Sequence, residues 1–192
     1  MGGAVGSNSI EARYFQELQS EEALSSFVNS QKHLYSTPVQ NLTEKDAEYV
    51  IVAVKHFFEH VVIIQYEIHN TLDDQILSEV QIKISKIETQ HGLKMKGMIP
   101  LHEEDQIKFD EKRFAYVILS LEGATTPYPL VTISQKMTFK VTQIDVESQD
   151  DLGSYEEEYG SIYDLTISTK DYIRGLELPK GQFKDSWESI GA

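Results

Sequence analysis

The stretch from Glu48 to Ile84, "EYVIVAVKHFFEHVVIIQYEIHNTLDDQILSEVQIKI", decides the fold, because apolar side chains recur at every second position on both sides of a polar hexapeptide. Successive side chains of an extended strand point to opposite faces. One face therefore collects Val62, Ile64, Tyr66 and Ile68 before the hexapeptide, and Val80, Ile82 and Ile84 after it. This alternation predicts two half-buried β-strands.

The hexapeptide itself, "NTLDDQ" at Asn70–Gln75, allows two interpretations. Asn and Asp bond to their own backbone in turns, so the segment is typical of a connection between strands. Its adjacent carboxylates, Asp73 and Asp74, would instead serve a metal if another loop converged on them, since Ca²⁺ takes roughly six to eight oxygen ligands. The clean alternation on both sides favours the turn.

The same period of two recurs along the chain and predicts an all-β fold. It is clearest in "VTISQKMTFKVT", residues 131–142, and such alternation indicates an antiparallel sheet with one solvated face. We expect strands near residues 48–58, 60–69, 76–85, 92–99, 112–121, 130–143 and 162–169. This spacing, without long intervening helices, indicates an immunoglobulin-like antiparallel β-sandwich, with a closed barrel as the alternative. The predicted core is Val62, Ile64, Tyr66, Ile68, Val80, Ile82, Ile84, Ile133, Phe139 and Val141.

The N-terminal part has a different pattern. Between Ile10 and Asn29 the apolar residues fall three or four positions apart, which predicts one or two short helices. Residues 31–45 are mixed and polar, and predict a linker. The start, "MGGAVGSNS", lacks the apolar centre of a signal peptide, and Gly6 stands where a myristoylation signal needs Ser or Thr. We therefore expect residues 1–45 to form a leader, a short helical segment and a linker.

Composition excludes several classes of function. The chain has 17 Lys and Arg against 31 Asp and Glu, a net charge of −14, so its surface repels phosphate backbones and anionic lipids. Nucleic acid is therefore not an expected partner. The absence of cysteine removes disulfides, thiolate nucleophiles and Cys-based metal sites, and fits a cytoplasmic setting. No segment reaches the ~18 consecutive apolar residues of a membrane span.

No motif points to catalysis or to a resident cofactor. The histidines are His33, His56, His60, His69, His91 and His102, and none has the spacing of HExxH or another metal motif. Packing or surface exposure explains them better than metal binding does. The sequence also lacks a GxSxG nucleophile elbow and a phosphate-cradling Gly loop. We therefore predict no enzyme, no cofactor and no catalytic or metal residue, and we identify no partner-binding residue.

One segment is strongly acidic. Residues 145–164, "DVESQDDLGSYEEEYGSIYD", hold eight carboxylates and no cation, which usually indicates a solvated loop. Carboxylates at this density also attract basic peptides and divalent ions. The ionic alternative is a Ca²⁺-dependent, C2-like membrane-binding sandwich, in which the metal bridges to lipid phosphates. Its ligands would be Asp73, Asp74, Asp145, Asp150 and Asp151.

Residues 43–191 resemble the appendage domain of the coatomer gamma subunit, an adaptor of coat protein complex I (COPI). The most specific part is "NTLDDQILSEV", residues 70–80. The first stretch carries the resemblance through Glu48, Tyr49, Val50, Lys55, His56, Phe58, Gln65, Asn70, Thr71, Leu72, Asp74, Gln75, Leu77 and Val80. Downstream, "QKMTFKVTQID", "YEEEYGSIYDLTIS" and "FKDSWESIG" are similar to the family's long strand, its acidic segment and its Phe…Trp…Gly region, whereas residues 91–128 depart from the family pattern.

The resemblance implies an appendage of two parts, an immunoglobulin-like sandwich and then a platform subdomain. We accordingly assign residues 46–178 to the sandwich and residues 179–192 to the start of a platform that is missing from the chain. Phe183, Trp187 and Ile190, spaced as one helical face, would lie at the junction. The implied function is a non-enzymatic vesicle-coat adaptor module, which supports Golgi-to-ER retrograde and intra-Golgi transport by recruiting accessory and regulatory proteins.

The resemblance also implies partners and a location. The partners are the other coatomer subunits, through the full-length protein, and an Arf GTPase-activating protein, through the missing platform. The location is cytoplasmic, peripheral on the cytosolic side of Golgi membranes and COPI-coated vesicles. Association with the membrane would be indirect, through the coat.

Overall fold

The computed structural model describes residues 10–89, 94–101, 105–124, 128–173 and 181–190. The helices of these residues are α1 (Ile10–Ser20), α2 (Glu22–Ser30), α3 (Thr169–Tyr172) and α4 (Phe183–Ile190). The strands are β1 (His33–Ser36), β2 (Gln40–Asn41), β3 (Tyr49–Phe58), β4 (Val61–Asn70), β5 (Gln75–Thr89), β6 (Lys94–Ile99), β7 (Lys112–Ser120), β8 (Val131–Ile144), β9 (Asp151–Tyr159) and β10 (Leu165–Ile167). The predicted strands all appear, with small shifts at their ends.

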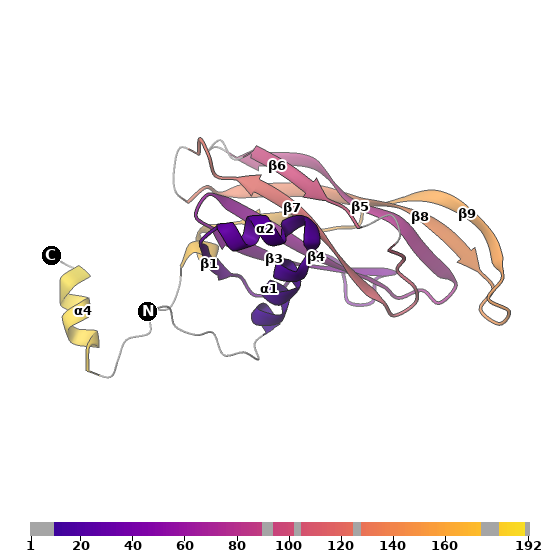
Figure 1. The fold of residues 1–192 in the computed structure, drawn as a ribbon, viewed down its shortest axis with the longest axis horizontal. Coiled ribbons are helices and arrows are strands. Elements are labelled where there is room, and N and C mark those ends of the chain that lie inside the picture. Colours follow the sequence, from indigo (N-terminus) through magenta and orange to yellow (C-terminus); the bar gives the residue numbers. More distant parts are fainter. Residues whose placement is uncertain (1–9, 90–93, 102–104, 125–127, 174–180, 191–192) are drawn as a thin grey trace.

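The strands form two antiparallel sheets that lie face to face (Figure 1). In the described residues, the larger sheet has the order β1-β3-β4-β7-β6, and β2 also pairs with β3. The smaller sheet has the order β10-β8-β5, and β9 pairs with the C-terminal part of β8. The chain crosses between the sheets from β4 to β5, from β5 to β6 and from β7 to β8. The predicted antiparallel sandwich is therefore confirmed.

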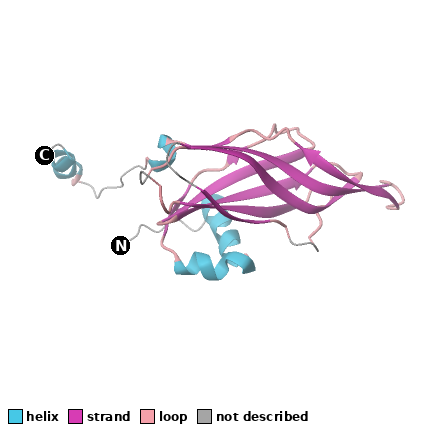
Figure 2. Ribbon diagram, turned by 90° about the horizontal axis from the view of Figure 1, so that it is seen from above, coloured by secondary structure: helices cyan, strands magenta, loops and turns pink. Residues whose placement is uncertain are grey.

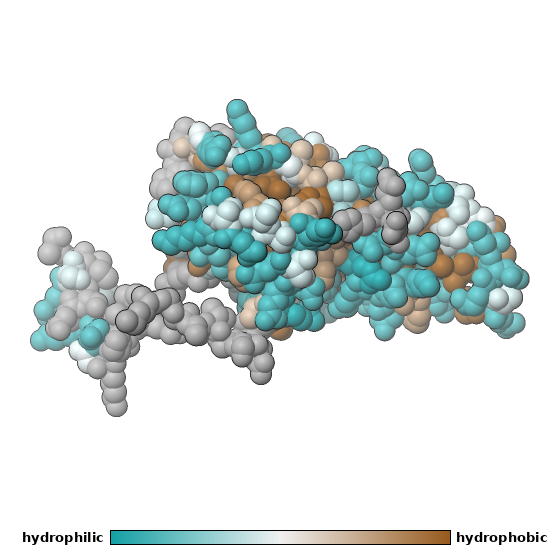
Figure 3. All heavy atoms as spheres, in the orientation of Figure 1, coloured by the Kyte–Doolittle hydropathy of each residue, from teal (hydrophilic) through white to brown (hydrophobic). Residues whose placement is uncertain are grey.

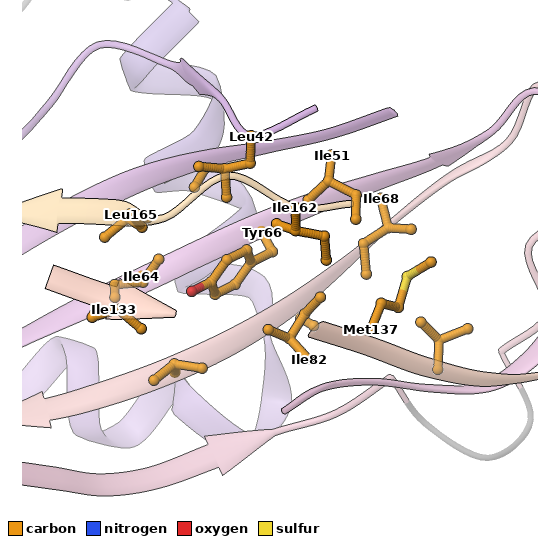
Figure 4. Close-up of a cluster of buried hydrophobic side chains, with 14 of the residues drawn as sticks. Leu42, Ile51, Ile64, Tyr66, Ile68, Ile82, Ile133, Met137, Ile162 and Leu165 are labelled. Atoms are coloured by element: carbon orange, nitrogen blue, oxygen red, sulfur yellow. The ribbon is translucent and has the colours of Figure 1, made fainter. Parts of the chain in front are cut away.

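The predicted core lies between the two sheets (Figure 4). Of the ten residues predicted to be inside, all are buried except Ile84, which is half-buried and packs against the cluster. Tyr66 lies deep in this core and donates its hydroxyl proton to Gln135 Oε1 at 2.6 Å. Gln135 Nε2 in turn donates to the carbonyl of Tyr163 at 3.1 Å, so these buried polar groups are paired.

Helices pack on the outer face of the larger sheet, so the prediction that the strand at residues 60–69 is only half-buried is wrong. Figure 2 shows α1 and α2 against one side of the sandwich. Their buried residues form a second apolar cluster with the sheet, made of Leu18, Leu24, Val28, Phe58, Val61, Ile63 and Tyr116. The apolar stripe of a short amphipathic helix needs such a surface, because an isolated helix of this length is marginal in water. In the described residues no helix is long and apolar enough to cross a membrane.

Polar residues on the covered face are buried together with the apolar ones. Glu67 of β4 accepts a hydrogen bond from the Tyr14 hydroxyl at 3.0 Å and lies 2.8 Å from Lys112 Nζ. Burial, reinforced by the charge of Glu67, raises the pKa of Tyr14 to about 12. The hydrogen bond from Tyr14 therefore joins α1 to the larger sheet, in addition to the apolar packing.

The predicted linker at residues 31–45 contributes strands to the larger sheet. In β1, Tyr35 lies opposite Phe57, and in β2, Asn41 lies opposite Val52. The segment between the helices and β3 is thus held along one edge of that sheet. The division of the chain into units at residues 46 and 179 stays a prediction.

Candidate interaction surface

The hexapeptide at Asn70–Gln75 is a structural turn between the two sheets. Asn70 is fully buried, and its Oδ1 accepts a hydrogen bond from Leu72 N at 3.0 Å. Its Nδ2 donates to the carbonyls of Gln75 at 2.8 Å and Ile107 at 3.2 Å. One side chain therefore closes the turn and joins it to the segment before β7, and the turn interpretation is confirmed.

The acidic segment is largely a strand, so the prediction of a loop is wrong for Asp151–Tyr159. This strand, β9, pairs with β8 without interruption from Met137↔Tyr159 to Gln143↔Gly153. Backbone N–H and C=O groups of β9 therefore bond to β8, whereas in a solvated loop they would bond to water. The prediction of exposure is correct, because residues 151–158 are all exposed.

The turn that leads into β9 is organised by Asp145. Its Oδ1 accepts hydrogen bonds from Ser148 N at 2.8 Å and from Glu147 N at 2.9 Å. These bonds stabilise the charged form and lower the pKa of Asp145. The β8–β9 hairpin extends to the end of the molecule away from β1 (Figure 1).

The two faces of β9 differ. Ser154, Glu156 and Glu158 lie opposite the polar residues Thr142, Lys140 and Thr138 of β8. Tyr155, Glu157 and Tyr159 lie opposite Val141, Phe139 and Met137, whose side chains are in the core. Tyr159 packs against that core, whereas Tyr155 is 44% exposed. The strand thus presents carboxylates on both faces and one accessible aromatic ring.

The solvated face of the smaller sheet is hollowed between β5, β8 and β9. The hollow has a volume of about 440 Å³, and its lining includes Lys83, Lys140, Glu156 and Glu158. Figure 3 shows the opposite, helix-bearing side of the molecule, whose surface towards β9 is also mostly hydrophilic. Charges of both signs border the hollow. Such a lining suits a polar protein contact better than a small apolar ligand.

Three of the five carboxylates proposed as Ca²⁺ ligands accept hydrogen bonds in the β8–β9 turn or at the start of β9. Ile144 N donates to the carbonyl of Asp74 at 2.8 Å, so the β4–β5 turn does lie beside the end of β8. However, Asp145, Asp150 and Asp151 each accept hydrogen bonds from their own turn or strand start. In the part of the chain that the structure describes, no group of three or more His, Asp or Glu is arranged to hold a metal ion.

Among the histidines, His56 has the most confined environment. It is fully buried, with Nδ1 2.7 Å from Ser36 Oγ and Nε2 2.8 Å from Gln65 Oε1. Burial lowers the pKa of His56 to about 4. This Ser–His–Gln chain lies beneath α1, where the ring of Phe15 approaches it, so it serves packing rather than nucleophilic chemistry. His91 and His102 lie outside the described residues.

A second hollow, of about 390 Å³, lies between the β1–β2 connection and α3. Lys55 reaches its base, where Nζ lies 2.8 Å from Asp171 Oδ1 and 2.8 Å from the carbonyl of Thr166. The other carboxylate oxygen of Asp171 accepts a hydrogen bond from Ser168 N at 2.7 Å. The buried cation is therefore occupied by internal partners.

The helical spacing of the C-terminal aromatics is confirmed by α4. The rings of Phe183 and Trp187 stack with their centroids 6.0 Å apart, and each residue is 67% exposed. Nothing is described of the side chain of Ile190, the third residue of this predicted face.

These features define a class of protein: a β-sandwich module that presents polar surfaces and uses its buried polar groups for internal bonds. Residues 12–168 match the family model described as "Coatomer gamma subunit appendage platform subdomain". The chain belongs to this family, and the resemblance is confirmed over residues 43–168 of the stretch that carries it. The family is one of coat subunits and not of enzymes.

Curated relatives show the same relationship. The chain is 31% identical to the coatomer subunit gamma of Dictyostelium discoideum over 160 residues, 83% of this chain, and 31% identical to the probable coatomer subunit gamma of Schizosaccharomyces pombe over 172 residues, 88% of this chain. It is 27% identical to the human coatomer subunit gamma-2 over 157 residues, 81% of this chain. These matches cover 17%, 18% and 17% of the relatives' own lengths, so the chain spans less than a fifth of each.

The family description uses the name of the platform for residues 12–168, whereas the resemblance places a platform after residue 179. Where a sandwich ends and a platform begins therefore stays a prediction.

Sequence reasoning identified no partner-binding residue and missed the strand that carries the exposed carboxylates. The available signal was the alternation of Tyr155, Glu157 and Tyr159 with Ser154, Glu156 and Glu158, in which two aromatic residues share one face. The high density of carboxylates in this segment favoured the interpretation as a loop over that as a strand.

Proposed function

We propose that this chain is the appendage module of a coatomer gamma subunit, and that it recruits accessory and regulatory proteins to the COPI coat. The single observation that carries the proposal is the family match over residues 12–168. In this role the module supports Golgi-to-ER retrograde and intra-Golgi transport, and it acts by binding, without catalysis.

The proposed assembly partners are the other coatomer subunits, which the module meets as part of the longer gamma subunit. The proposed location is the cytosolic side of Golgi membranes and COPI-coated vesicles. A net charge of −14 supports an indirect association with the membrane, because anionic lipids repel an acidic surface. Many copies on one coat turn weak contacts into useful avidity through effective concentration.

An Arf GTPase-activating protein is the proposed regulator. The resemblance assigns its contact to the platform, and the family description gives that name to residues 12–168, so we propose that it binds this chain directly. The exposed polar face of the smaller sheet supports a protein contact, since the hollow between β5, β8 and β9 is lined largely by polar and charged groups.

The test is a titration of the purified regulator against residues 1–192 and against the complete gamma subunit. Both proteins are expected to bind with similar affinity. Binding by the complete subunit alone would overturn the assignment to this chain. In cells, a gamma subunit without this module should still join coatomer while recruiting less of the regulator to Golgi membranes; unchanged recruitment would contradict the proposed function.

A further inference from the structure

We propose that the outer edge of β9 binds an extended, basic segment of a partner protein by strand addition. β9 pairs with β8 along one edge, and within the described residues no strand pairs with its other edge. β10 pairs with β8 at Val131–Ile133, beyond the part that β9 occupies, and so does not cover β9. In an antiparallel sheet the outer N–H and C=O groups of alternate residues on an edge strand remain available to another strand.

The exposed edge is long and regular. Residues Gly153–Tyr159 keep an unbroken register with β8, and the one register shift falls at Gln143/Ile144, next to the turn. Natural edge strands are commonly blocked by proline, by lysine or by a bulge in mid-strand. Residues 154–159, "SYEEEY", contain neither proline nor lysine, so the backbone of this edge can serve as a template.

The negative charge of β9 favours a basic segment as the strand that pairs with its outer edge. Glu156, Glu157 and Glu158 follow one another, so carboxylates project from both faces of β9. Lys136 pairs with Glu158 at 2.6 Å, but no ion pair to Glu156 or Glu157 is formed within the described residues. Pairing of β9 with β9 of a second copy would bring these carboxylates together, and like charges across strands are destabilising. Arginine or lysine side chains on an incoming strand would have the opposite effect.

The tyrosines beside the carboxylates further define the sequence of the basic segment that β9 would bind. Tyr155 is 44% exposed and lies on the same face as Tyr159, with Glu157 between them. Directly opposed side chains on neighbouring strands contact one another. The preferred segment therefore has three consecutive basic residues flanked by apolar ones, so that the apolar side chains meet the two tyrosines.

Strand addition at β9 would provide a binding surface for the proposed recruitment function, and its biological role rests on that proposed function. The chemistry of the edge can nevertheless be tested without the coat. The regulator titration and coat recruitment test the proposed function, whereas a peptide titration tests only β9.

The probe is a fluorescein-labelled peptide, Thr-Val-Arg-Lys-Arg-Val-Thr, whose palindromic sequence fits either strand direction. It is titrated into residues 1–192 by fluorescence anisotropy. The double variant Glu156→Gln/Glu157→Gln should weaken binding roughly tenfold, as expected for losing two exposed charge pairs. The matched control Glu59→Gln/Glu122→Gln removes the same charge from exposed positions elsewhere and should leave the affinity within about twofold. Equal weakening by both variants would overturn the site.

Backbone pairing is tested with two further peptides of unchanged charge, N-methylated at the odd or at the even residues. Only one of these two sets faces β9, so one peptide should lose binding and the other should retain it. Amide hydrogen exchange should likewise show new protection at alternate residues of β9 when the unmodified peptide binds. Equal affinity of the two methylated peptides, or no change in β9 protection, would reduce the effect to general charge attraction and overturn strand addition. If residues 1–192 bind the regulator but not the unmodified peptide, strand addition at β9 is refuted while the proposed function stands.

Discussion

Lys55 Nζ and Asp171 Oδ1 lie 2.8 Å apart, and the two side chains are only 3% and 6% exposed. Lys55 belongs to β3 of the larger sheet, whereas Asp171 lies in α3, after the last strand of the smaller sheet. Burial lowers the pKa of Lys55, and Asp171 opposes that shift by favouring the charged form. This ion pair therefore ties the segment after β10 to the opposite sheet.

Replacing Asp171 with Asn should destabilise the protein strongly, because it leaves the Lys55 charge buried without its counter-charge. Removing one partner of a buried ion pair typically costs about 3–5 kcal/mol of unfolding free energy. Urea denaturation measures this loss. Adding Lys55→Met to the same protein should restore part of it, since the unpaired charge is then absent.

The exposed pair between Lys136 and Glu158 is the matched control. Glu158→Gln should change the unfolding free energy by less than about 1 kcal/mol, because exposed ion pairs contribute little. Similar losses in Asp171→Asn and Glu158→Gln would show that burial does not govern the Lys55–Asp171 pair.

A second prediction concerns the two faces of the smaller sheet. Ile82 and Phe139 are buried, whereas Thr138 lies on the solvated face of β8. Ile82→Asp or Phe139→Asp should cost on the order of 3 kcal/mol or more, because each places an unpaired charge in the core. Thr138→Lys should cost little. Thermal or urea unfolding of the three variants measures the change in unfolding free energy. Equal losses of stability on both faces would contradict the alternation of buried and solvated side chains.

The sandwich could be predicted from the sequence because its inner face imposes a period of two. Val62 to Ile68 and Ile133 to Val141 alternate in the sequence and are buried in the structure. The same argument could not find the outer cluster, since Ile63 and Tyr116 are covered by helices from a distant part of the chain. Contacts of this kind depend on tertiary packing rather than on local pattern.

The candidate surface was harder to predict than the core. Asn70 could be recognised as a turn residue from its type and flanking strands, because the chemistry of an Asx turn is local. The strand at β9 could not be recognised in the same way, since carboxylates are poor strand formers and its pairing with Lys140 and Phe139 depends on β8. The ion pair of Lys55 with Asp171 joins residues far apart in the sequence and leaves no periodic signal.

A third prediction tests whether α1 is integral to the fold. Leu18 is completely buried in the outer cluster, whereas Ile10 of the same helix is 61% exposed. Leu18→Ala should lower the unfolding free energy by about 2–5 kcal/mol, the usual range for truncating a buried leucine. Ile10→Ala serves as the control and should have little effect. If Leu18→Ala is as mild as Ile10→Ala in chemical denaturation, the helices do not stabilise the sandwich.

A fourth prediction concerns calcium. The carboxylates of Asp145 and Asp150 accept hydrogen bonds within the β8–β9 turn, so we expect millimolar Ca²⁺ to leave the melting temperature unchanged. A ligand that binds only the folded state at a hundredfold excess over its dissociation constant would add ~2.7 kcal/mol of stability. Differential scanning calorimetry with and without Ca²⁺ measures this. A rise in melting temperature that disappears in Asp74→Asn or Asp150→Asn would support the C2-like alternative.

A fifth prediction concerns pH and the buried imidazole of His56. Its pKa is about 4 in the folded protein, against about 6.5 for an unperturbed histidine. Between these values the folded state keeps His56 neutral while the unfolded state binds a proton, so acidification favours unfolding. The contribution of His56 should therefore be constant above about pH 7 and fall by roughly 3 kcal/mol as the pH drops to about 4.

The variant His56→Gln isolates this contribution from the carboxylates that titrate in the same range, because those are common to both proteins. The neutral amide does not titrate, so the difference in unfolding free energy between parent and variant should shrink steadily from pH 7 to pH 4. His33 lies nearby, with ring centroids 6.4 Å apart, and its charge further opposes protonation of His56. Urea denaturation at several pH values measures the difference. A difference that is the same at pH 7 and pH 4 would mean that His56 binds its proton equally well in both states, despite its burial between Ser36 and Gln65.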